Sequence, residues 1–519
     1  IYSLVRARQR DLGVLGDSSS EEEESHSSSS LEDSIRINVP CKEQMASAAP
    51  LPLCSVCARQ SAGEGGKDSI RVAAEEASFE CALCFGILHP SFIDEVSKAG
   101  EAHLASCPYD ATSFILALNL PTSQTLREQI IKKRFPSFNG ILADIPFKVR
   151  NINAYLSKLQ QASGLRPTLM SDLQLTITFE NDDFLETDTE FLRRAFPQEF
   201  RSGKKRRQNG EENGNGEPEL TKNRLQNMLG RVDEKLASTF PVEKAPSRPC
   251  KFSFAFERDP VYIAGRYCKY SRSLPQSPWS AEEDTPLIPG HSVSEKVTGP
   301  MAKLLGSTET RFVASGREDI DVRMLGEGRP FVVHLINCRN TQTLRPDRRV
   351  ETLSALRAAI NKGSVDVAVS ELALLSREVA EQLSMGQEDK KKLYTAYCYS
   401  TLPIDNSVLK AATRTEPLEI IQKTPVRVMK RRALLDRPRS IYTLETMPVD
   451  EHHFLVRMET QAGTYIKEFV HGDFGRTRPS LADLIGCEKG EVDIVELDVE
   501  KVDLVWPPVD TGKKDEKKK

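Results

Sequence analysis

Hydrophobic and polar residues along the 519-residue chain follow the two periods that distinguish strands from helices. Within residues 172–180 every second residue is apolar, as a half-buried strand requires. This face consists of Leu173, Leu175, Ile177 and Phe179. Further strands are predicted at 331–336, 453–460 and 492–506, and residues 352–361 have helical spacing. The pattern predicts an α+β protein with a sheet-rich C-terminal half.

Polar, low-complexity segments interrupt this pattern. Residues 17–34 consist mainly of serine and acids and cannot bury enough apolar surface to fold alone, so a disordered acidic arm is expected over 1–46. Residues 201–224 predict a disordered insertion. Within it, Lys204 to Arg207 fit either a nuclear-localisation signal or a solvated loop. Residues 511–519 are expected to form a basic tail.

Length and charge narrow the picture further. A chain of 519 residues exceeds one ordinary core, and the Pro-rich stretch 273–290 is the best candidate for a domain boundary. No apolar run approaches the roughly 20 residues of a membrane span, and residues 1–10 lack a signal-peptide core, so an intracellular protein without membrane contact is expected. The net charge of −4 includes eight acids in residues 11–35. The remainder is mildly basic, which is compatible with nucleic acid.

Four of the eleven cysteines form two CxxC pairs, Cys54 with Cys57 and Cys81 with Cys84. Each pair can turn two thiolates toward one ion, and together they complete a tetrahedral zinc site. Four thiolates leave zinc no open position, so one structural ion per chain is expected. Four buried or redox-active cysteines are the alternative.

Residues 261–279 interleave aromatic and basic side chains. Aromatic rings can stack on bases and cations can reach phosphates, so the mixture suits irregular or single-stranded RNA, although tyrosines in a strand are more often core residues. The RNA-binding candidates are Tyr267, Lys269 and Arg272.

Three short motifs follow in the C-terminal half: GRED at 316–319, KKLYTAY at 391–397 and GTYIKEF at 463–469. Each alone is weak, but in this order they resemble the motifs of pseudouridine synthases. The similarity is closest to the archaeal and eukaryotic family, the tenth in the naming series, that forms pseudouridine in the T-arm of tRNA. It covers roughly residues 50–510, without the 201–224 insertion.

This resemblance implies a zinc-binding segment at 47–108 and a THUMP-like α/β RNA-binding domain at 109–290. It implies a mixed-sheet pseudouridine synthase domain at 291–510. The expected activity is isomerisation of uridine at tRNA position 55, with position 54 as a second target.

The motifs also imply roles for individual residues. Asp319 corresponds to the catalytic aspartate and Asp321 does not. Arg317 corresponds to the loop arginine beside Asp319, and Tyr394 corresponds to the active-site tyrosine. Lys467 corresponds to the basic partner of Asp319, which is usually an arginine in bacterial relatives. A lysine gives up the bidentate fork of arginine. Tyr465 and Leu481 are at positions that line such sites.

The reaction breaks the N1–C1′ bond of uridine and rejoins the base through C5, without gain or loss of electrons. No redox or nucleotide cofactor is expected, and the chain has neither a GxxxxGK[ST] nor a GxGxxG motif. An ionised carboxylate must either attack C1′ or remove the C2′ proton, and the sequence does not choose between them. Tyr394 can stack on uracil and help the C5 proton leave. The target must leave its stack to be reached, and Arg317 could fill the vacated space.

Residues 423–439 are strongly basic, and phosphate contact follows from the proposed substrate. The candidates are Arg427, Lys430, Arg431 and Arg432. The expected partner is tRNA, with other structured RNAs as further candidates, and the protein is expected to be a monomer in nucleus and cytoplasm. The competing hypothesis is an RNA-binding processing factor or scaffold whose main role is not catalytic.

Overall fold

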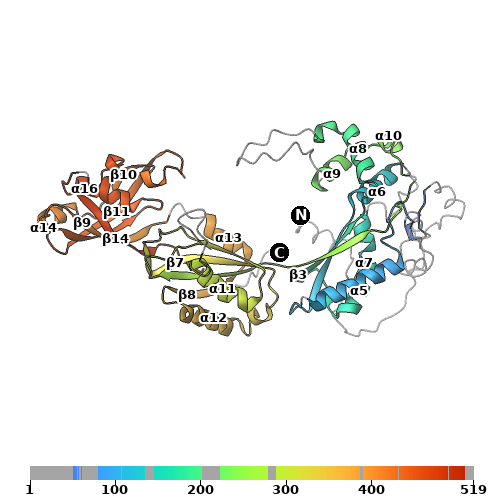
Figure 1. Cartoon of the computed structure of the whole chain (residues 1–519), viewed down its shortest axis with the longest axis horizontal. Coiled ribbons are helices and arrows are strands. Elements are labelled where there is room, and N and C mark those ends of the chain that lie inside the picture. Colours follow the sequence, from blue (N-terminus) through green and yellow to red (C-terminus); the bar gives the residue numbers. More distant parts are fainter. Residues whose placement is uncertain are drawn as a thin grey trace, which may run out of the picture. The chain divides into compact units, whose positions relative to one another are not determined.

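The computed structural model describes residues 51–54, 56–57, 60, 80–106, 108–134, 145–200, 222–242, 244–278, 288–385, 390–430, 432–488 and 490–508. The chain divides into two compact units, with the boundary between Arg258 and Asp259 (Figure 1). The boundary therefore precedes the Pro-rich stretch 273–290 in which it was expected. The predicted arm at 1–46, the signal at 204–207 and the tail at 511–519 lie outside the described residues.

The first unit contains a four-stranded sheet in the order β2-β1-β3-β4. Its strands are β1 (Ser113–Asn119), β2 (Arg166–Pro167), β3 (Leu173–Glu180) and β4 (Lys251–Arg258). β1 runs parallel to β2 and β3, whereas β4 pairs antiparallel with β3. The strand predicted at 172–180 is confirmed as β3, whose apolar face is almost fully buried.

Helices cover this sheet because their apolar stripes complete its core. Helix α5 (Pro90–Ser106) and helix α7 (Phe147–Ser163) bury Val96 and Tyr155 against β3 residues such as Ile177. The other helices of this unit are α6 (Thr122–Arg134), α8 (Leu185–Ala195), α9 (Lys222–Leu229) and α10 (Glu234–Ser238).

The second unit is built on a ten-stranded mixed sheet in the order β13-β10-β11-β12-β9-β14-β7-β5-β8, with β6 paired to β7. Its strands are β5 (Val261–Lys269), β6 (Glu309–Ala314), β7 (Arg323–Ile336), β8 (Val367–Leu375), β9 (Lys392–Ser400), β10 (Leu418–Lys423), β11 (Asp436–Pro448), β12 (His453–Thr460), β13 (Thr477–Arg478) and β14 (Val492–Val502). The strands predicted at 331–336, 453–460 and 492–506 are confirmed as β7, β12 and β14, although β14 ends at Val502.

Helices lie on both faces of the β5 end of this sheet. Neighbouring β5 residues point to opposite faces, so Ile263 packs in the core with Val297 of α11, while Tyr262 packs with Ala380 of α13. The helix predicted at 352–361 is confirmed within α12. The helices of this unit are α11 (Val293–Leu305), α12 (Arg349–Gly363), α13 (Arg377–Met385), α14 (Asn406–Ala412), α15 (Ile466–His471) and α16 (Leu481–Leu484). Within the ranges given above, no helix has the length and apolarity to cross a membrane.

Candidate active site and candidate metal centre

The GRED motif forms the loop between β6 and β7. The loop can turn sharply because Gly316 adopts a φ of 89°, which a residue with a side chain rarely tolerates. The amide of Ser315 donates to the carbonyl of Pro330 at 2.9 Å, tying the start of the loop to β7. The backbone therefore directs Glu318 inward and Asp319 outward.

A buried ion pair anchors the inner side of this loop. Arg329 of β7 donates from Nε to Oε2 of Glu318 at 2.7 Å and from Nη1 to the Ser315 carbonyl at 2.9 Å. The Tyr267 hydroxyl donates to Glu318 at 2.8 Å, and the Gln276 amide donates to Tyr267 at 2.7 Å. Each of these hydrogen bonds is therefore accepted either by a loop residue or by Tyr267, which itself donates to the loop.

The Lys269 ammonium is the second anchor. It donates to the carbonyls of Leu274, Asp319 and Ile320 at 2.9, 3.1 and 2.8 Å. Burial lowers the pKa of Lys269 to about 8. The expectation that Tyr267 and Lys269 contact RNA is therefore wrong, since both side chains are fully buried behind the proposed catalytic loop.

Arg272 has a similar structural role. It bridges β14 and the loop through ion pairs to Glu496 at 2.6 Å and Asp498 at 2.8 Å and a hydrogen bond to the Asp321 carbonyl at 3.0 Å. Two carboxylates already compensate its charge, so Arg272 braces the strand against the loop, and its contact with RNA stays a prediction. Arg323 also pairs with Asp498, at 2.5 Å.

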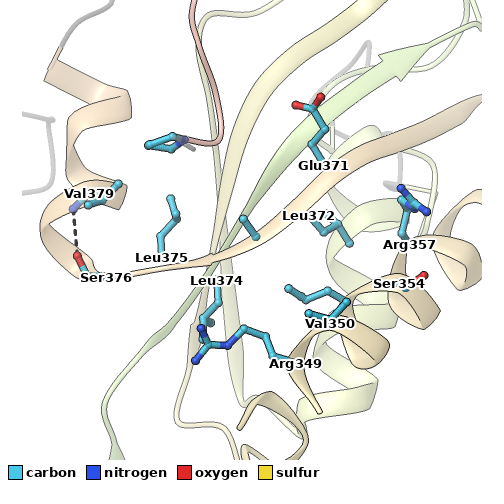
Figure 2. A pocket seen from close by; sticks show the side chains of 13 residues that line it. Arg349, Val350, Ser354, Arg357, Glu371, Leu372, Leu374, Leu375, Ser376 and Val379 are labelled. Carbon is cyan, nitrogen blue, oxygen red and sulfur yellow. Dashed lines mark hydrogen bonds between the residues drawn. The ribbon is translucent and has the colours of Figure 1, made fainter. Parts of the chain in front are cut away.

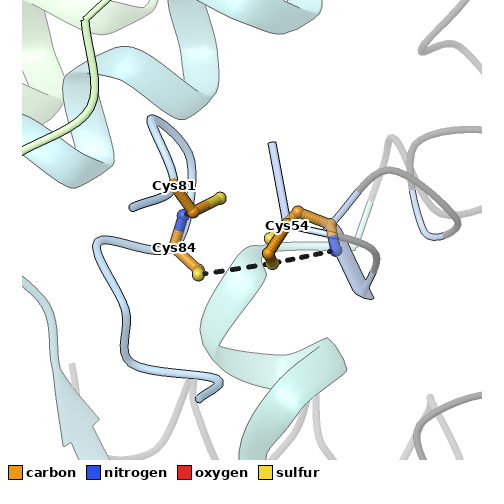
Figure 3. A group of neighbouring side chains, drawn as sticks. Cys54, Cys81 and Cys84 are labelled. Atoms are coloured by element: carbon orange, nitrogen blue, oxygen red, sulfur yellow. Dashed lines mark hydrogen bonds between the residues drawn. The ribbon is translucent and has the colours of Figure 1, made fainter. Parts of the chain in front are cut away.

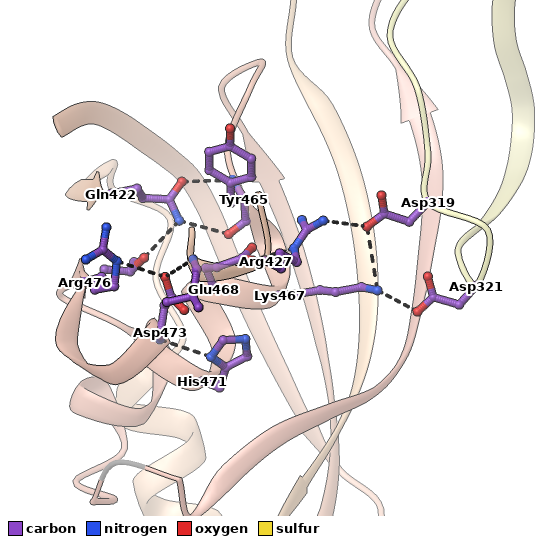
Figure 4. Close-up of polar contacts among 12 residues, drawn as sticks. Asp319, Asp321, Gln422, Arg427, Tyr465, Lys467, Glu468, His471, Asp473 and Arg476 are labelled. Atoms are coloured by element: carbon purple, nitrogen blue, oxygen red, sulfur yellow. Dashed lines mark hydrogen bonds and ion pairs between the residues drawn. The ribbon is translucent and has the colours of Figure 1, made fainter. Parts of the chain in front are cut away.

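Two cations approach the Asp319 carboxylate, which is about half exposed (Figure 4). Arg427 Nη1 lies 3.2 Å from Asp319 Oδ2, whereas Lys467 Nζ lies 3.8 Å from the same oxygen. Lys467 is closer to Asp321 Oδ2, at 2.6 Å. The structure thus brings Asp319 and Lys467 together as predicted, but the shorter contact comes from Arg427, which was predicted to contact phosphate.

Glu468 positions Arg427 and was missed from the sequence. Its buried carboxylate accepts a hydrogen bond from Arg427 Nε at 2.6 Å (Figure 4). It follows Lys467 directly at the start of α15, so one helical turn supplies both the second cation and the residue that orients the first. The only sign of this role in the sequence was that the acid Glu468 directly follows Lys467 in the GTYIKEF motif.

Asp321 pairs with Lys467 and lies apart from the Asp319–Arg427 contact. Burial alone would raise the pKa of Asp321, but the hydrogen bond and charge of Lys467 outweigh it and lower that pKa. Its carboxylate is the more exposed of the two, at 62% against 48%. The two aspartates thus differ in their partners, since Asp319 contacts both Arg427 and Lys467 and Asp321 pairs with Lys467.

The two candidate tyrosines differ in their surroundings. Tyr394 lies in β9, packs against the core and is half-buried. Burial raises the pKa of its hydroxyl to about 12, so Tyr394 is a neutral phenol at ordinary pH. Tyr465 precedes α15, and its backbone amide and carbonyl are both bonded by Gln422 at 2.9 Å (Figure 4).

The remaining predicted residues lie at the surface or in the core. Arg317 is exposed and makes no hydrogen bond or ion pair with the residues that the structure describes. Lys430 and Arg432 are also exposed, and Arg431 lies outside the described residues. Leu481 is fully buried at the first position of α16.

A separate pocket of about 650 Å³ lies between α12 and β8 (Figure 2). Arg349 and Arg357 line it on the helix side, and Glu371 and Leu374 line it on the strand side. None of the residues predicted for catalysis lines this pocket, so the pocket is separate from the candidate active site.

The two CxxC pairs meet in the first unit. All four cysteines are buried, and their sulfur atoms lie within 4.8 Å of one another (Figure 3). Amides of Cys57 and Cys84 point at the sulfurs of Cys54 and Cys81 at 3.5 and 3.4 Å. Four ligands at about 2.3 Å from a tetrahedral zinc would lie about 3.8 Å apart. The Cys54–Cys84 sulfur separation is 3.8 Å, so the group fits such an ion.

Comparisons with known proteins identify relatives of this chain. A family model described as "Pus10, C-terminal" matches residues 262–503. The chain is 34% identical over 442 residues to the tRNA pseudouridine synthase Pus10 of Xenopus laevis, covering 82% of this chain and 81% of that protein. It is 36% identical over 246 residues to the tRNA pseudouridine synthase Pus10 of Thermofilum pendens, covering 47% and 53%. Among solved structures, a Cbf5-Nop10-Gar1 complex matches 46% of this chain and 58% of its own, with 17% identity and a TM-score of 0.24.

Proposed function

Since the chain belongs to the Pus10 family of tRNA pseudouridine synthases, we propose that it isomerises uridine in the tRNA T-arm with Asp319 as the catalytic carboxylate. The proposed target is position 55, with position 54 as a second target. The observation that carries the proposal is the environment of Asp319: its loop is anchored from behind by Glu318 and Lys269, and two cations face its carboxylate.

The rigid loop suits the chemistry. A carboxylate that attacks C1′ or removes the C2′ proton must meet one atom of a nucleotide, so a fixed backbone reduces the freedom lost on reaching the transition state. Arg427 and Lys467 place positive charge on one side of Asp319 and orient its Oδ2. The remaining carboxylate oxygen is free to face the sugar.

Tyr394 is proposed to stack on uracil. As a neutral phenol whose pKa is raised to about 12 by burial, it suits stacking and hydrogen-bond donation better than acceptance of the C5 proton. Its position on β9 places it on the sheet rather than on a mobile loop. Arg317, exposed two residues before Asp319, is proposed to enter the space that the extruded base leaves.

Basic residues beyond the loop are proposed to hold the tRNA backbone. Lys430 and Arg432 are exposed and carry no ion pair within the part of the chain that the structure describes. They lie three and five residues after Arg427 in the chain, so phosphates bound there would lie near the proposed catalytic carboxylate. Arg431 is proposed to contact phosphate as well, because it lies between Lys430 and Arg432 in the sequence.

One zinc ion is proposed for the four-cysteine group. The sulfur spacing and burial fit a tetrahedral thiolate site, and zinc bound to four thiolates supplies structural cross-linking with no open position for chemistry. The sulfurs belong to a core that includes Leu126 and Ile130 of α6, so the ion would stabilise the first unit. A THUMP-like role in RNA binding for that unit, a monomeric state and location in nucleus and cytoplasm complete the proposal.

Pseudouridine mapping on an unmodified tRNA transcript tests the function. The wild-type chain should modify the T-arm, and Asp319→Asn should remove product while leaving tRNA affinity unchanged. Asp321→Asn is the matched control, since it removes a carboxylate from the same loop and should retain activity. Full activity of Asp319→Asn would falsify the assignment of Asp319 as the catalyst. Pseudouridine found only in other arms of the tRNA would contradict the T-arm as the target. Tight tRNA binding without product from the wild-type chain would favour the non-catalytic scaffold.

A further inference from the structure

Lys392 lies in the strand that carries the proposed active-site tyrosine and reaches the catalytic loop. It opens β9 and shares a face with Tyr394, because alternate residues of a strand point the same way. Its Nζ lies 3.0 Å from the position that a Cβ on Gly316 would occupy. Gly316 begins the GRED motif, so the ammonium touches the loop three residues before Asp319.

The Lys392 ammonium differs from its neighbours in having no anionic partner. Arg329 Nη1 approaches the same Gly316 position at 3.0 Å, but its guanidinium is closed in the pair with Glu318. The Lys392 ammonium makes no hydrogen bond or ion pair within the described ranges. At Gly316, Arg329 and Lys392 thus approach a single carboxylate, Glu318, which already pairs with Arg329, so the Lys392 charge has no close counter-ion among the described residues.

Burial makes this uncompensated charge unfavourable in the free protein. Lys392 is half-buried, and burial, with a smaller contribution from Arg329, lowers its pKa to about 8, against the opposing effect of Glu318. Lys390 adds to the repulsion. An unpaired cation held in such a place gains most when an anion arrives from outside.

We propose that Lys392 binds a phosphate of the tRNA beside the target nucleotide and so holds the extruded uridine next to Asp319. The inference rests on the proposed function, which brings the RNA strand to this loop. Phosphate is the anion that every nucleotide supplies, and a lysine ammonium binds it as a compact point charge. The neighbouring Tyr394 would meet the base while Lys392 meets the backbone.

Salt dependence of tRNA affinity tests this contact without relying on turnover. Binding of unmodified tRNA transcript to Lys392→Met should have a slope of log affinity against log salt that is smaller by about 0.7 to 0.9 than that of the wild type. Lys391→Met is the matched control. This neighbour faces the other way, donates to Glu459 at 3.1 Å and lies 4.4 Å from the Tyr442 ring centre. Its removal should leave the slope unchanged.

A second variant separates a phosphate contact from a structural role. Lys392→Arg keeps the charge and should retain the wild-type slope. Wild-type affinity should also fall as pH rises above about 8, where the free Lys392 ammonium loses its proton, and Lys392→Arg should show a smaller fall, because Lys269, whose pKa burial also lowers to about 8, remains in both proteins. Of the groups near Lys392, burial raises the pKa of Tyr394 to about 12, and the Arg329–Glu318 pair and Lys390 remain in all variants.

The outcomes distinguish this inference from the proposed function. An unchanged slope for Lys392→Met, with or without a loss of thermal stability, overturns the phosphate contact. Equal losses in Lys392→Met and Lys392→Arg also overturn it. Full activity of Asp319→Asn would instead contradict the catalytic role of Asp319, and the binding measurements on the Lys392 variants would remain valid.

Discussion

Glu318, the residue directly before the proposed catalyst, forms an ion pair with Arg329 at 2.7 Å in which both side chains are at most 1% exposed. The pair links the loop to β7, the long strand that follows it, so the position of Asp319 depends on charges that no solvent reaches.

Removal of the Glu318 charge should destabilise the second unit. Glu318→Gln leaves Arg329 buried without its counter-ion, and breaking one partner of such a pair costs about 3–5 kcal/mol. Urea unfolding should show this loss. Glu327→Gln is the control, since Glu327 is 62% exposed and lies 3.8 Å from its nearest cation, Arg266. Equal stability of the two variants would contradict the anchoring role of Glu318.

Replacement of Arg427 by lysine should lower turnover more than tRNA affinity. Lysine keeps the charge but cannot contact Asp319 and Glu468 with the geometry of the guanidinium. A lost charge-assisted hydrogen bond is worth about 1.5–3 kcal/mol, or roughly 10- to 100-fold in rate. Single-turnover kinetics with saturating enzyme measures it. Glu468→Gln should also lower turnover, by a smaller factor. If Arg427→Lys lowered only the affinity for tRNA, Arg427 would be a phosphate contact and not a partner of the catalyst.

Loss of the zinc ion proposed for the four cysteines should unfold the first unit and spare the second. Cys81→Ser removes one of four ligands, and elemental analysis should show about one zinc fewer per chain. Circular dichroism should then show a partial loss of structure. Cys268→Ser in β5 is the control and should keep the metal. Zinc content that does not change in Cys81→Ser would exclude the site.

The Asp183 carboxylate should make the stability of the first unit depend on acid pH. It accepts hydrogen bonds from the Ser247 amide and hydroxyl at 2.7 and 2.9 Å and from Arg248 Nη2 at 2.7 Å. Burial alone would raise the pKa of Asp183, but the bonds from Arg248 and Ser247 outweigh it and lower that pKa.

Because the folded-state pKa lies below the unfolded one, the stabilisation is complete above the unfolded value of about 3.9 and is lost as pH falls through the folded value. Asp183→Asn should therefore be less stable than the wild type at neutral pH, and the two stabilities should converge in acid. Chemical denaturation at a series of pH values measures this. A difference that persists unchanged below pH 3 would rule out the titration of Asp183 as its cause.

The sequence by itself determined those features that depend on neighbours along the chain. The two-residue period of 172–180 places Leu173 and Ile177 on one face of a strand wherever that strand pairs. The CxxC spacing brings two sulfurs together within one turn, which makes each half of the metal site a local property. The order of the short motifs likewise predicted Asp319, and not Asp321, as the catalytic carboxylate.

The tertiary structure alone decided which charged residues lie around Asp319 and which are buried. Tyr267 and Lys269 have the composition of an RNA-binding segment, yet β5 is an internal strand, and its neighbours β7 and β8 bury them behind the loop. Arg427 lies 108 residues from Asp319 in the chain and becomes its nearest cation only through the packing of α15 and Glu468. The physical reason is that burial and ion pairing are set by residues distant in sequence, and a basic side chain has the same composition whether it meets a phosphate, a carbonyl or a carboxylate.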